Sequence, residues 1–390
     1  MALNVQPLSS GPLAGRRVVL VHDWLTGMRG GEKVLESFCR LCPQAPLYTL
    51  LHNQGSVSPL IEGRPIVTSF LQGLPGVASR YRHYLPLFPR AAESLRLPDC
   101  DLVLSSSHCV AKGVIAPPGA LHVSYVHTPM RYVWDLYDQY FGPGRGGMAR
   151  WVMPFLRGWL QGWDTRTASR VHEFLANSRH VARRIERHYG RPATVIHPPV
   201  DSGRFAPAPE VDDYYLVVSA LVPYKRVDLA VAACSRLGRR LKVVGTGPEL
   251  KALMALAGPS VEFLGWQPDQ ALPGLYARAR ALIFPGEEDF GITPLESMAS
   301  GRPVLAYGRG GALETVIPPG DPGGRPATGL FLNQQSVPAL AAALEEMEDL
   351  EAGLKAFEPQ ALADHAAGFD TLVFEQSLAR FLTQALSRAA

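Results

Sequence analysis

The chain has 390 residues, of which 47% are hydrophobic and 19% are charged, and its formal net charge is +3. Single hydrophobic cores stop growing at roughly 250–300 residues, so this length predicts two domains. The composition excludes wholesale disorder, and a charge balance this mild argues against a nucleic-acid binder.

The sequence predicts a cytoplasmic protein. Residues 1–15 are rich in Pro, Gly and Ser without the order of a signal peptide, and no run reaches the about 18 apolar residues of a membrane span. The five cysteines form no disulfide framework. Cys39 and Cys42 make a lone C-x-x-C within an apolar, helical stretch, which predicts buried thiols rather than a metal or redox site.

The first half of the chain alternates short apolar runs with helical patterns. Strands are predicted over 17–22, 101–105, 121–126 and 174–178, with helices over 31–42 and 180–189. Such alternation is typical of parallel βαβ units. A proline-rich stretch then begins at His197, and paired prolines cannot continue a helix. We therefore place a domain boundary there and expect domains over 1–197 and 198–369.

The same pattern restarts after the boundary, with strands predicted over 215–219, 241–245, 261–264, 281–284 and 303–306. Two successive units of this kind predict an α/β protein with two Rossmann-like domains whose parallel sheets face a central cleft. Ligands of such sheets bind at the carboxyl ends of the strands, so functional residues are expected in loops that follow strands.

The most specific motif follows the strand predicted over 281–284 and reads Glu288-Asp-Phe-Gly-Ile-Thr-Pro-Leu-Glu296. A helix N-terminus attracts anions, and nearby carboxylates accept hydrogen bonds from sugar hydroxyls, which suits a nucleotide sugar. A structural role for Glu296 is the alternative. Thr293 as N-cap, Pro294 as first helical residue and Glu296 at the third position would form a capping box.

This motif resembles that of the retaining nucleotide-sugar glycosyltransferases of GT4 type, and more narrowly that of bacterial mannosyltransferases of O-antigen and exopolysaccharide synthesis. The resemblance runs from Val18 to the C-terminal helix and implies the GT-B fold, with that helix, 370–390, returning to the first domain. It implies that Glu288 contacts the donor sugar and Glu296 the ribose. The donor-binding segment between them would be Phe290, Gly291, Ile292 and Thr293, with Thr293 near the diphosphate.

A second candidate segment contains Lys225 and Arg226, between a predicted strand and a helix. A lysine here can neutralise the charge that develops on the β-phosphate when the glycosidic bond breaks, although surface Lys-Arg pairs are commonly only solvated. The family often carries an arginine a few residues earlier, where this chain has Ala220. Either Arg226 substitutes for it, or phosphate binding depends on Lys225 and backbone N–H groups.

The first predicted strand leads into a loop that contains Asp23, Gly30 and Gly31. Glycines let a backbone approach a phosphate closely, but the spacing is not the G-x-G-x-x-G of dinucleotide-binding proteins, and a plain flexible turn is the alternative. The resemblance places Gly30 and Gly31 across the cleft from the donor phosphates.

His127 directly follows the strand predicted over 121–126. A lone histidine is more often structural, but the resemblance implies that this one meets the donor sugar at the reaction centre, which makes it the leading catalytic candidate. On the acceptor side the candidates are Asp23, His108 and Arg131.

Two further patterns have competing interpretations. Asp99 and Asp101 match the D-x-D of metal-dependent glycosyltransferases, but they begin a strand instead of ending one, so we expect no metal and no other cofactor. Residues 80–90 mix arginines with aromatics, and Trp151, Trp159 and Trp163 follow further on. They suit either a peripheral contact at the inner face of a membrane or helices packed on a core.

Together these patterns predict a retaining hexosyltransferase that transfers a sugar to a glycan or lipid-linked acceptor in polysaccharide synthesis. The resemblance favours GDP-mannose as donor and a same-face attack in which the departing phosphate takes the acceptor's proton. The alternatives are a sugar-nucleotide epimerase of similar architecture and, less favoured, a nicotinamide oxidoreductase or a non-catalytic carbohydrate-binding protein. The oxidoreductase would need a complete glycine fingerprint with an acid about 20 residues on.

Overall fold

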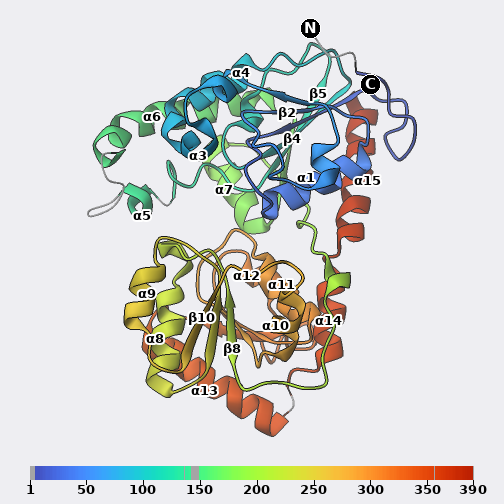
Figure 1. The fold of residues 1–390 in the computed structure, drawn as a ribbon. Helices are drawn as coiled ribbons and strands as arrows, with labels where there is room; N and C mark the ends of the chain where they lie inside the picture. The colour runs from blue at the N-terminus through green and yellow to red at the C-terminus, as the bar shows by residue number, and fades with distance from the viewer. Residues whose placement is uncertain (1–4, 136, 142–148, 355, 390) are drawn as a thin grey trace. The chain divides into compact units, whose positions relative to one another are not determined.

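The computed structural model describes residues 5–135, 137–141, 149–354 and 356–389 (Figure 1). The chain divides into two compact units. The first unit comprises Met1–Pro199 and Leu372–Ala390, and the second comprises Val200–Thr371. The division falls close to the boundary predicted after residue 197, and the C-terminal helix is part of the first unit.

A parallel sheet of seven strands forms the centre of the first unit, in the order β3-β2-β1-β4-β5-β6-β7. The strand order reverses between β1 and β4, which are paired in parallel from Val18 opposite Leu102 to His22 opposite Ser106. At such a reversal the chain leaves the two strands toward opposite faces of the sheet, which opens space at their carboxyl ends. The strands are β1 (Val18–His22), β2 (Leu47–Thr49), β3 (Ile66–Thr68), β4 (Leu102–Ser107), β5 (Leu121–Val126), β6 (Glu173–Ala176) and β7 (Thr194–Val195).

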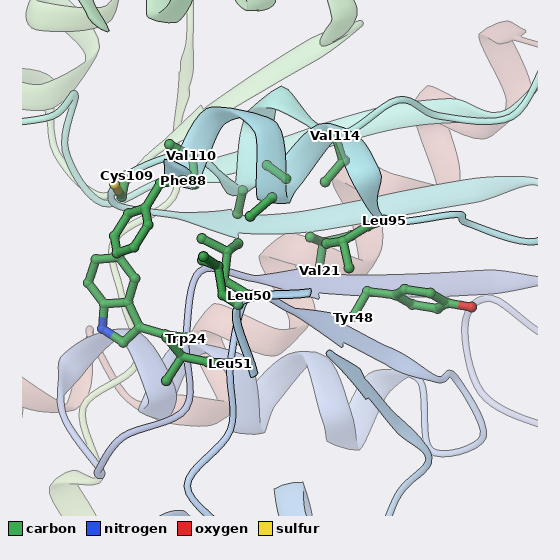
Figure 2. Packing of buried hydrophobic residues seen from close by; sticks show 14 of the residues in the cluster. Val21, Trp24, Tyr48, Leu50, Leu51, Phe88, Leu95, Cys109, Val110 and Val114 are labelled. Carbon is green, nitrogen blue, oxygen red and sulfur yellow. The ribbon is translucent and has the colours of Figure 1, made fainter. Parts of the chain in front are cut away.

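Helices cover both faces of this sheet. They are α1 (Gly30–Leu41), α2 (Pro59–Glu62), α3 (Val77–Arg80), α4 (Phe88–Ser94), α5 (Tyr137–Phe141), α6 (Ala149–Thr167), α7 (Arg179–Tyr189) and α15 (Thr371–Ala389). Alternate residues of β1 serve different cores: Val19 and Val21 pack in one apolar cluster, and Val18 and Leu20 in another. Figure 2 shows Val21 in the first of these clusters together with Trp24, Phe88 and Tyr48.

The C-terminal helix α15 is built into the second of these cores. Phe374, Leu378 and Leu382 are buried there, and the ring centroid of Phe374 lies 5.7 Å from that of Tyr125 on β5. The helix therefore contributes to the hydrophobic core of the first unit although it comes last in the chain.

The second unit contains a parallel sheet of six strands in the order β10-β9-β8-β11-β12-β13. The strands are β8 (Tyr215–Val218), β9 (Leu241–Val244), β10 (Val261–Gly265), β11 (Leu282–Phe284), β12 (Val304–Tyr307) and β13 (Gly329–Leu332). The helices are α8 (Val227–Leu237), α9 (Leu250–Leu256), α10 (Leu272–Arg278), α11 (Ile292–Ala299), α12 (Ala312–Thr315), α13 (Val337–Leu354) and α14 (Pro359–Ala367). Strand β11 lies between β8 and β12, so the loops after these three strands leave the sheet side by side.

Two smaller predictions are confirmed. Cys39 and Cys42 are buried free thiols, and burial raises the pKa of Cys39 to about 11 and that of Cys42 to about 12. The second prediction was that the D-x-D pattern begins a strand instead of ending one. Asp101 directly precedes β4 and pairs with Arg17, with 2.8 Å between Arg17 Nη2 and Asp101 Oδ1. In the parts of the chain that are described, no helix has both the length and the apolarity to cross a membrane.

Candidate active site

Polar clusters gather at the carboxyl ends of the strands in both units. In the second unit the centre is the loop from Pro285 to Gly291, which follows β11. Because β11 is flanked by β8 and β12, this loop is held between the loops that follow those two strands.

Glycines allow the three loops to pack backbone against backbone. A Cβ atom at position 286 would lie only 2.9 Å from the Cα of Lys225. On the opposite side, a Cβ at position 310 would lie 2.2 Å from the carbonyl oxygen of Glu288, and one at position 311 would lie 2.2 Å from the Cα of Phe290. Side chains at these positions would therefore push the loop out of place. Sequence reasoning did not single out these glycines, although the pair Gly310-Gly311 directly after a strand was a usable signal.

Lys225 and Glu288 form an ion pair between Nζ and Oε1. Lys225 ends the turn Pro223–Lys225 after β8, and its side chain is 20% exposed, whereas that of Glu288 is 8% exposed. The sequence named these residues from two separate motifs, and the structure brings them into contact. A carboxylate this buried needs a cationic partner, and Lys225 supplies it while staying accessible to solvent.

Arg226 has its guanidinium paired with Asp228. Nε lies 3.1 Å from Oδ1 and Nη2 lies 3.1 Å from Oδ2. Its backbone is left-handed, with φ of 52°, at the junction between the Lys225 turn and α8. The guanidinium is thus held toward Asp228 of α8 and not toward Glu288, and a role for Arg226 in place of the arginine missing at Ala220 stays a prediction.

The alternative considered for Glu296, a capping box with Thr293 as N-cap, is wrong. Helix α11 begins one residue before Thr293, at Ile292, and its N-cap is Gly291 with φ of 90°. Glu296 is therefore the fifth helical residue, too far along the helix to reach back to the cap. Gly291 offers no side chain to cap the helix, so the first N–H groups of α11 are left for another acceptor, which is the usual setting of an anion site.

Glu296 instead accepts a hydrogen bond from a neighbouring helix. Its Oε2 lies 2.8 Å from the hydroxyl of Tyr276 on α10, and both side chains are buried. Burial raises the pKa of the Tyr276 hydroxyl, and the nearby Glu296 carboxylate raises it further, so the tyrosine remains a hydrogen-bond donor. This hydrogen bond holds the Glu296 carboxylate against α10.

In the first unit, Asp23 organises the loop that follows β4. Its two carboxylate oxygens accept four backbone N–H groups, from His108 and Cys109 at 2.6 and 2.9 Å and from Val110 and Ala111 at 2.7 Å each. The side chain is fully buried. Asp23 also lies 3.2 Å from Nδ1 of His108. Asp23 is therefore too buried for the acceptor contact that we predicted for it. Of the two residues, His108 is the partly exposed one, and Asp23 orients it.

His127, in the loop after β5, takes part in a chain of polar side chains that starts at Glu32 on α1. Its Nε2 lies 2.8 Å from Oγ of Ser106, the same Oγ lies 3.1 Å from Nδ1 of His22, and Nε2 of His22 lies 3.7 Å from Oε1 of Glu32. Gly31 lies over the two rings, since a Cβ there would be 3.6 Å from His22 and 3.7 Å from His127. Thus the predicted residues Gly31, His127 and His108 lie in one cluster.

The remaining predicted residues of this unit lie nearby in the chain. Gly30 begins α1 and is exposed, and Arg131 lies half-buried in the turn at 131–135 after β5. Sequence reasoning missed His22, Ser106 and Glu32. The available signal was the polar residue at the end of each apolar strand, since His22 ends β1 and Ser106 is the second-last residue of β4.

The charge of Glu32 affects where the protons lie along this series of polar side chains. Burial raises the pKa of the Glu32 carboxyl, but its interactions with His22 and His108 outweigh burial, so its pKa is lowered and it is ionised at neutral pH. Nε2 of His22 faces this carboxylate at 3.7 Å, so we expect a proton on that nitrogen, with Nδ1 accepting from the Ser106 hydroxyl. Ser106 has one proton only, so its oxygen accepts from Nε2–H of His127. In this expected arrangement the proton of His127 is on Nε2.

Comparison with known proteins identifies the families of both units. The model of Glycosyltransferase Family 4 matches residues 29–204, and the model of Glycosyl transferases group 1 matches residues 203–363. Among solved structures, sucrose-phosphate synthase from Thermosynechococcus elongatus is similar with a TM-score of 0.69 and 16% identity over 95% of this chain and 99% of that one. Anabaena Alr3699/HepE in complex with UDP and glucose is similar with a TM-score of 0.67 and 17% identity over 94% and 99%.

These two parallel-sheet domains have the GT-B glycosyltransferase fold. The chain belongs to the glycosyltransferases, with a family 4 domain followed by a group 1 domain. These matches favour glycosyl transfer over the epimerase and oxidoreductase alternatives.

Curated relatives match over shorter stretches. The GDP-mannose-dependent alpha-(1-6)-phosphatidylinositol monomannoside mannosyltransferase of Mycolicibacterium smegmatis is 34% identical over 172 residues, which are 36% of this chain and 45% of that protein. The 2-deoxystreptamine glucosyltransferase of Streptomyces kanamyceticus is 29% identical over 39% of this chain and 41% of that protein. The chain thus spans about half the length of the curated relatives it matches.

The proton arrangement around His127 is testable with Glu32→Gln. A neutral amide can donate as well as accept, so it no longer fixes the His22 proton on Nε2, and we expect the His127 proton to distribute over both ring nitrogens. Side-chain ¹⁵N NMR of histidine-labelled protein reports the tautomer directly, and Glu36→Gln on the same helix is the control. An unchanged His127 tautomer in Glu32→Gln would show that Glu32 does not control it.

Proposed function

We propose that this protein is a retaining hexosyltransferase that transfers mannose from GDP-mannose to a glycan or lipid-linked acceptor. The observation that carries the proposal is the Lys225–Glu288 ion pair beside the N-terminus of α11, which has no side-chain cap. It provides a cation, backbone N–H groups and a buried carboxylate in one place, and a sugar diphosphate has a complementary anion next to hydroxyls.

The choice of donor rests on the relatives. The mycobacterial and corynebacterial proteins at 32–34% identity are named as GDP-mannose-dependent mannosyltransferases that act on phosphatidylinositol mannosides. The solved structures with UDP or UDP-glucose are 17–18% identical and support the fold alone. GDP-mannose is therefore the donor that we favour, and a lipid-linked acceptor is the corresponding proposal for the second substrate.

Each side chain then has a distinct role in the proposed reaction. Lys225 leaves Glu288 and pairs with the diphosphate, whose negative charge grows as the bond from the anomeric carbon to the phosphate oxygen breaks. Glu288 accepts hydrogen bonds from the sugar hydroxyls, and Glu296 accepts them from the ribose. His127 forms a hydrogen bond with a hydroxyl of the donor sugar.

The acceptor hydroxyl forms the new bond to the anomeric carbon on the face that the phosphate leaves. Its proton passes to the departing phosphate oxygen, so no protein base is consumed. The protein contributes positioning and charge stabilisation. We propose that this chemistry is independent of a metal ion, because Lys225 and the helix N-terminus supply the positive charge that a metal would otherwise provide.

The first test is the response to nucleotides in the presence of EDTA. GDP should raise the unfolding temperature, since a ligand at a hundredfold excess over its Kd stabilises a protein by about 2.7 kcal/mol, whereas NAD should not. GDP-mannose incubated without an acceptor should remain GDP-mannose by NMR. Conversion of the donor to an epimer would contradict the proposal, and stabilisation by GDP only after manganese is added would contradict metal independence.

The second test separates the two carboxylates of the motif. Glu296→Gln should weaken bare GDP about tenfold to hundredfold, because a hydrogen bond to a charged group contributes about 1.5–3 kcal/mol. Glu288→Gln should retain GDP affinity, because the change also frees Lys225 to pair with the diphosphate. It should lose the affinity that the mannose adds to GDP-mannose binding, and it should lose turnover. The exposed neighbour Glu287→Gln is the matched control. Calorimetry with GDP and GDP-mannose measures both effects, and equal GDP affinity in Glu296→Gln and wild type would remove Glu296 from the ribose site.

A further inference from the structure

The outer face of α6 is an exposed apolar surface. Trp151, Val152, Phe155 and Trp159 have 68%, 54%, 85% and 46% of their surface exposed. Their spacing places them along one side of the helix, because residues three to four apart share a face. Pro154 and Gly158 are also exposed between them. Arg157, the charged residue within this stretch, is half-buried and donates from Nε to the carbonyl oxygen of Val133 at 2.9 Å.

The opposite face of α6 is fixed in the core of the first unit. Met153, Leu160 and Trp163 are buried. The ring of Trp163 occupies the space above Gly113, where a Cβ would lie 2.3 Å from it, and its Nε1 donates to Glu93 of α4 at 3.0 Å. Of the three tryptophans that suggested a membrane interface, Trp163 therefore belongs to the core, and Trp151 and Trp159 face outward.

A buried ion pair also holds the end of this helix. Lys112 Nζ lies 2.9 Å from Oδ1 of Asp164, and the indole of Trp134 and the hydroxyl of Tyr189 donate to the other oxygen of Asp164 at 2.8 and 2.9 Å. The contacts of Trp163 and Asp164 thus hold the buried face of α6 against the first unit, and the exposed aromatic side chains project from the opposite face.

The elements around this face carry strong positive charge. Residues 80–96, which include η2 (Tyr81–Leu87) and α4, contain four arginines and one acid, and residues 149–170 also contain four arginines and one acid. The two segments together have a net charge of +6 (eight arginines less two acids), while the whole chain has +3. Both acids are engaged, Glu93 with Arg170 and Asp164 with Lys112. Figure 1 shows α6 near α4, and the hydrogen bond from Trp163 to Glu93 joins the two helices.

We propose that this surface, the outer face of α6 with the arginines of residues 80–96, docks the protein on an anionic lipid bilayer. Tryptophan and phenylalanine side chains insert at the boundary between headgroups and acyl chains, and neighbouring arginines attract anionic headgroups. The net charge of +6 distinguishes this occupant from a second copy of the chain, since two such faces would repel each other. The inference rests on the surface alone and does not depend on the proposed reaction.

Vesicle binding of the full chain tests this proposal without donor or acceptor. Sedimentation with vesicles of phosphatidylcholine containing about 30% phosphatidylglycerol should remove the protein from solution, whereas pure phosphatidylcholine should bind it at least about tenfold more weakly. Brominated lipids should quench part of the tryptophan fluorescence, because Trp151 and Trp159 enter the bilayer. The double variant Phe155→Ser/Trp159→Ser should lose vesicle binding about tenfold or more.

The matched control is Met254→Ser/Leu256→Ser, which removes two exposed apolar side chains from α9 in the second unit and should bind vesicles like wild type. Arg80→Gln/Arg82→Gln should weaken binding to anionic vesicles and reduce its salt dependence. Vesicle binding that survives in Phe155→Ser/Trp159→Ser, or that occurs without quenching by brominated lipid, would overturn the proposal. So would a dimer in solution that the same double variant dissociates, because the face would then be occupied by a second copy.

Discussion

The proposed donor site depends on the ion pair between Lys225 and Glu288. Partly buried ion pairs contribute little net stability, because desolvation of the two charges offsets their attraction. This pair nevertheless joins the loops after β8 and β11, and glycines on both sides of the β11 loop permit the close packing that brings the charges together. The ammonium stays accessible to solvent, and in the proposed reaction it exchanges the carboxylate for a phosphate while Glu288 turns to neutral hydroxyls. The packing of the three loops therefore positions the ion pair on which the proposed chemistry depends.

In the first unit, too, buried carboxylates lie near basic side chains, which here are histidines. One serine hydroxyl, that of Ser106, is shared by His22 and His127, and it has only one proton to donate. Glu32 is held at the start of α1 by the backbone N–H of Arg29 at 3.0 Å, and we expect its charge to decide which nitrogen of His127 carries the proton. Asp23 holds the adjacent loop through four backbone hydrogen bonds. Two buried carboxylates thus stand behind two half-buried histidines, Asp23 next to His108 and Glu32 at the far end of the chain that leads to His127.

Much of the fold could be predicted from the sequence, since the buried parallel strands are continuous apolar runs bounded by turn residues, and the predicted strands coincide with observed ones to within two or three residues. The capping geometry at Glu296 could not, because it depends on the left-handed backbone of Gly291, which starts α11 one residue before Thr293. The role of Asp23 was missed because its partners are backbone groups 85 to 88 residues away. Whether a tryptophan of α6 faces inward depends on Gly113, which no local pattern links to Trp163.

The role of Lys225 in donor binding is measured most directly by calorimetry, as the affinity of Lys225→Met for GDP compared with that of Arg226→Met. The two substitutions remove adjacent cations, but Lys225 is paired with the site carboxylate and Arg226 with Asp228. We predict that Lys225→Met binds GDP about tenfold to hundredfold more weakly than wild type, as expected for losing a charged hydrogen-bond partner, and that Arg226→Met stays close to wild type. Unchanged affinity in Lys225→Met, or an equal loss in Arg226→Met, would contradict it.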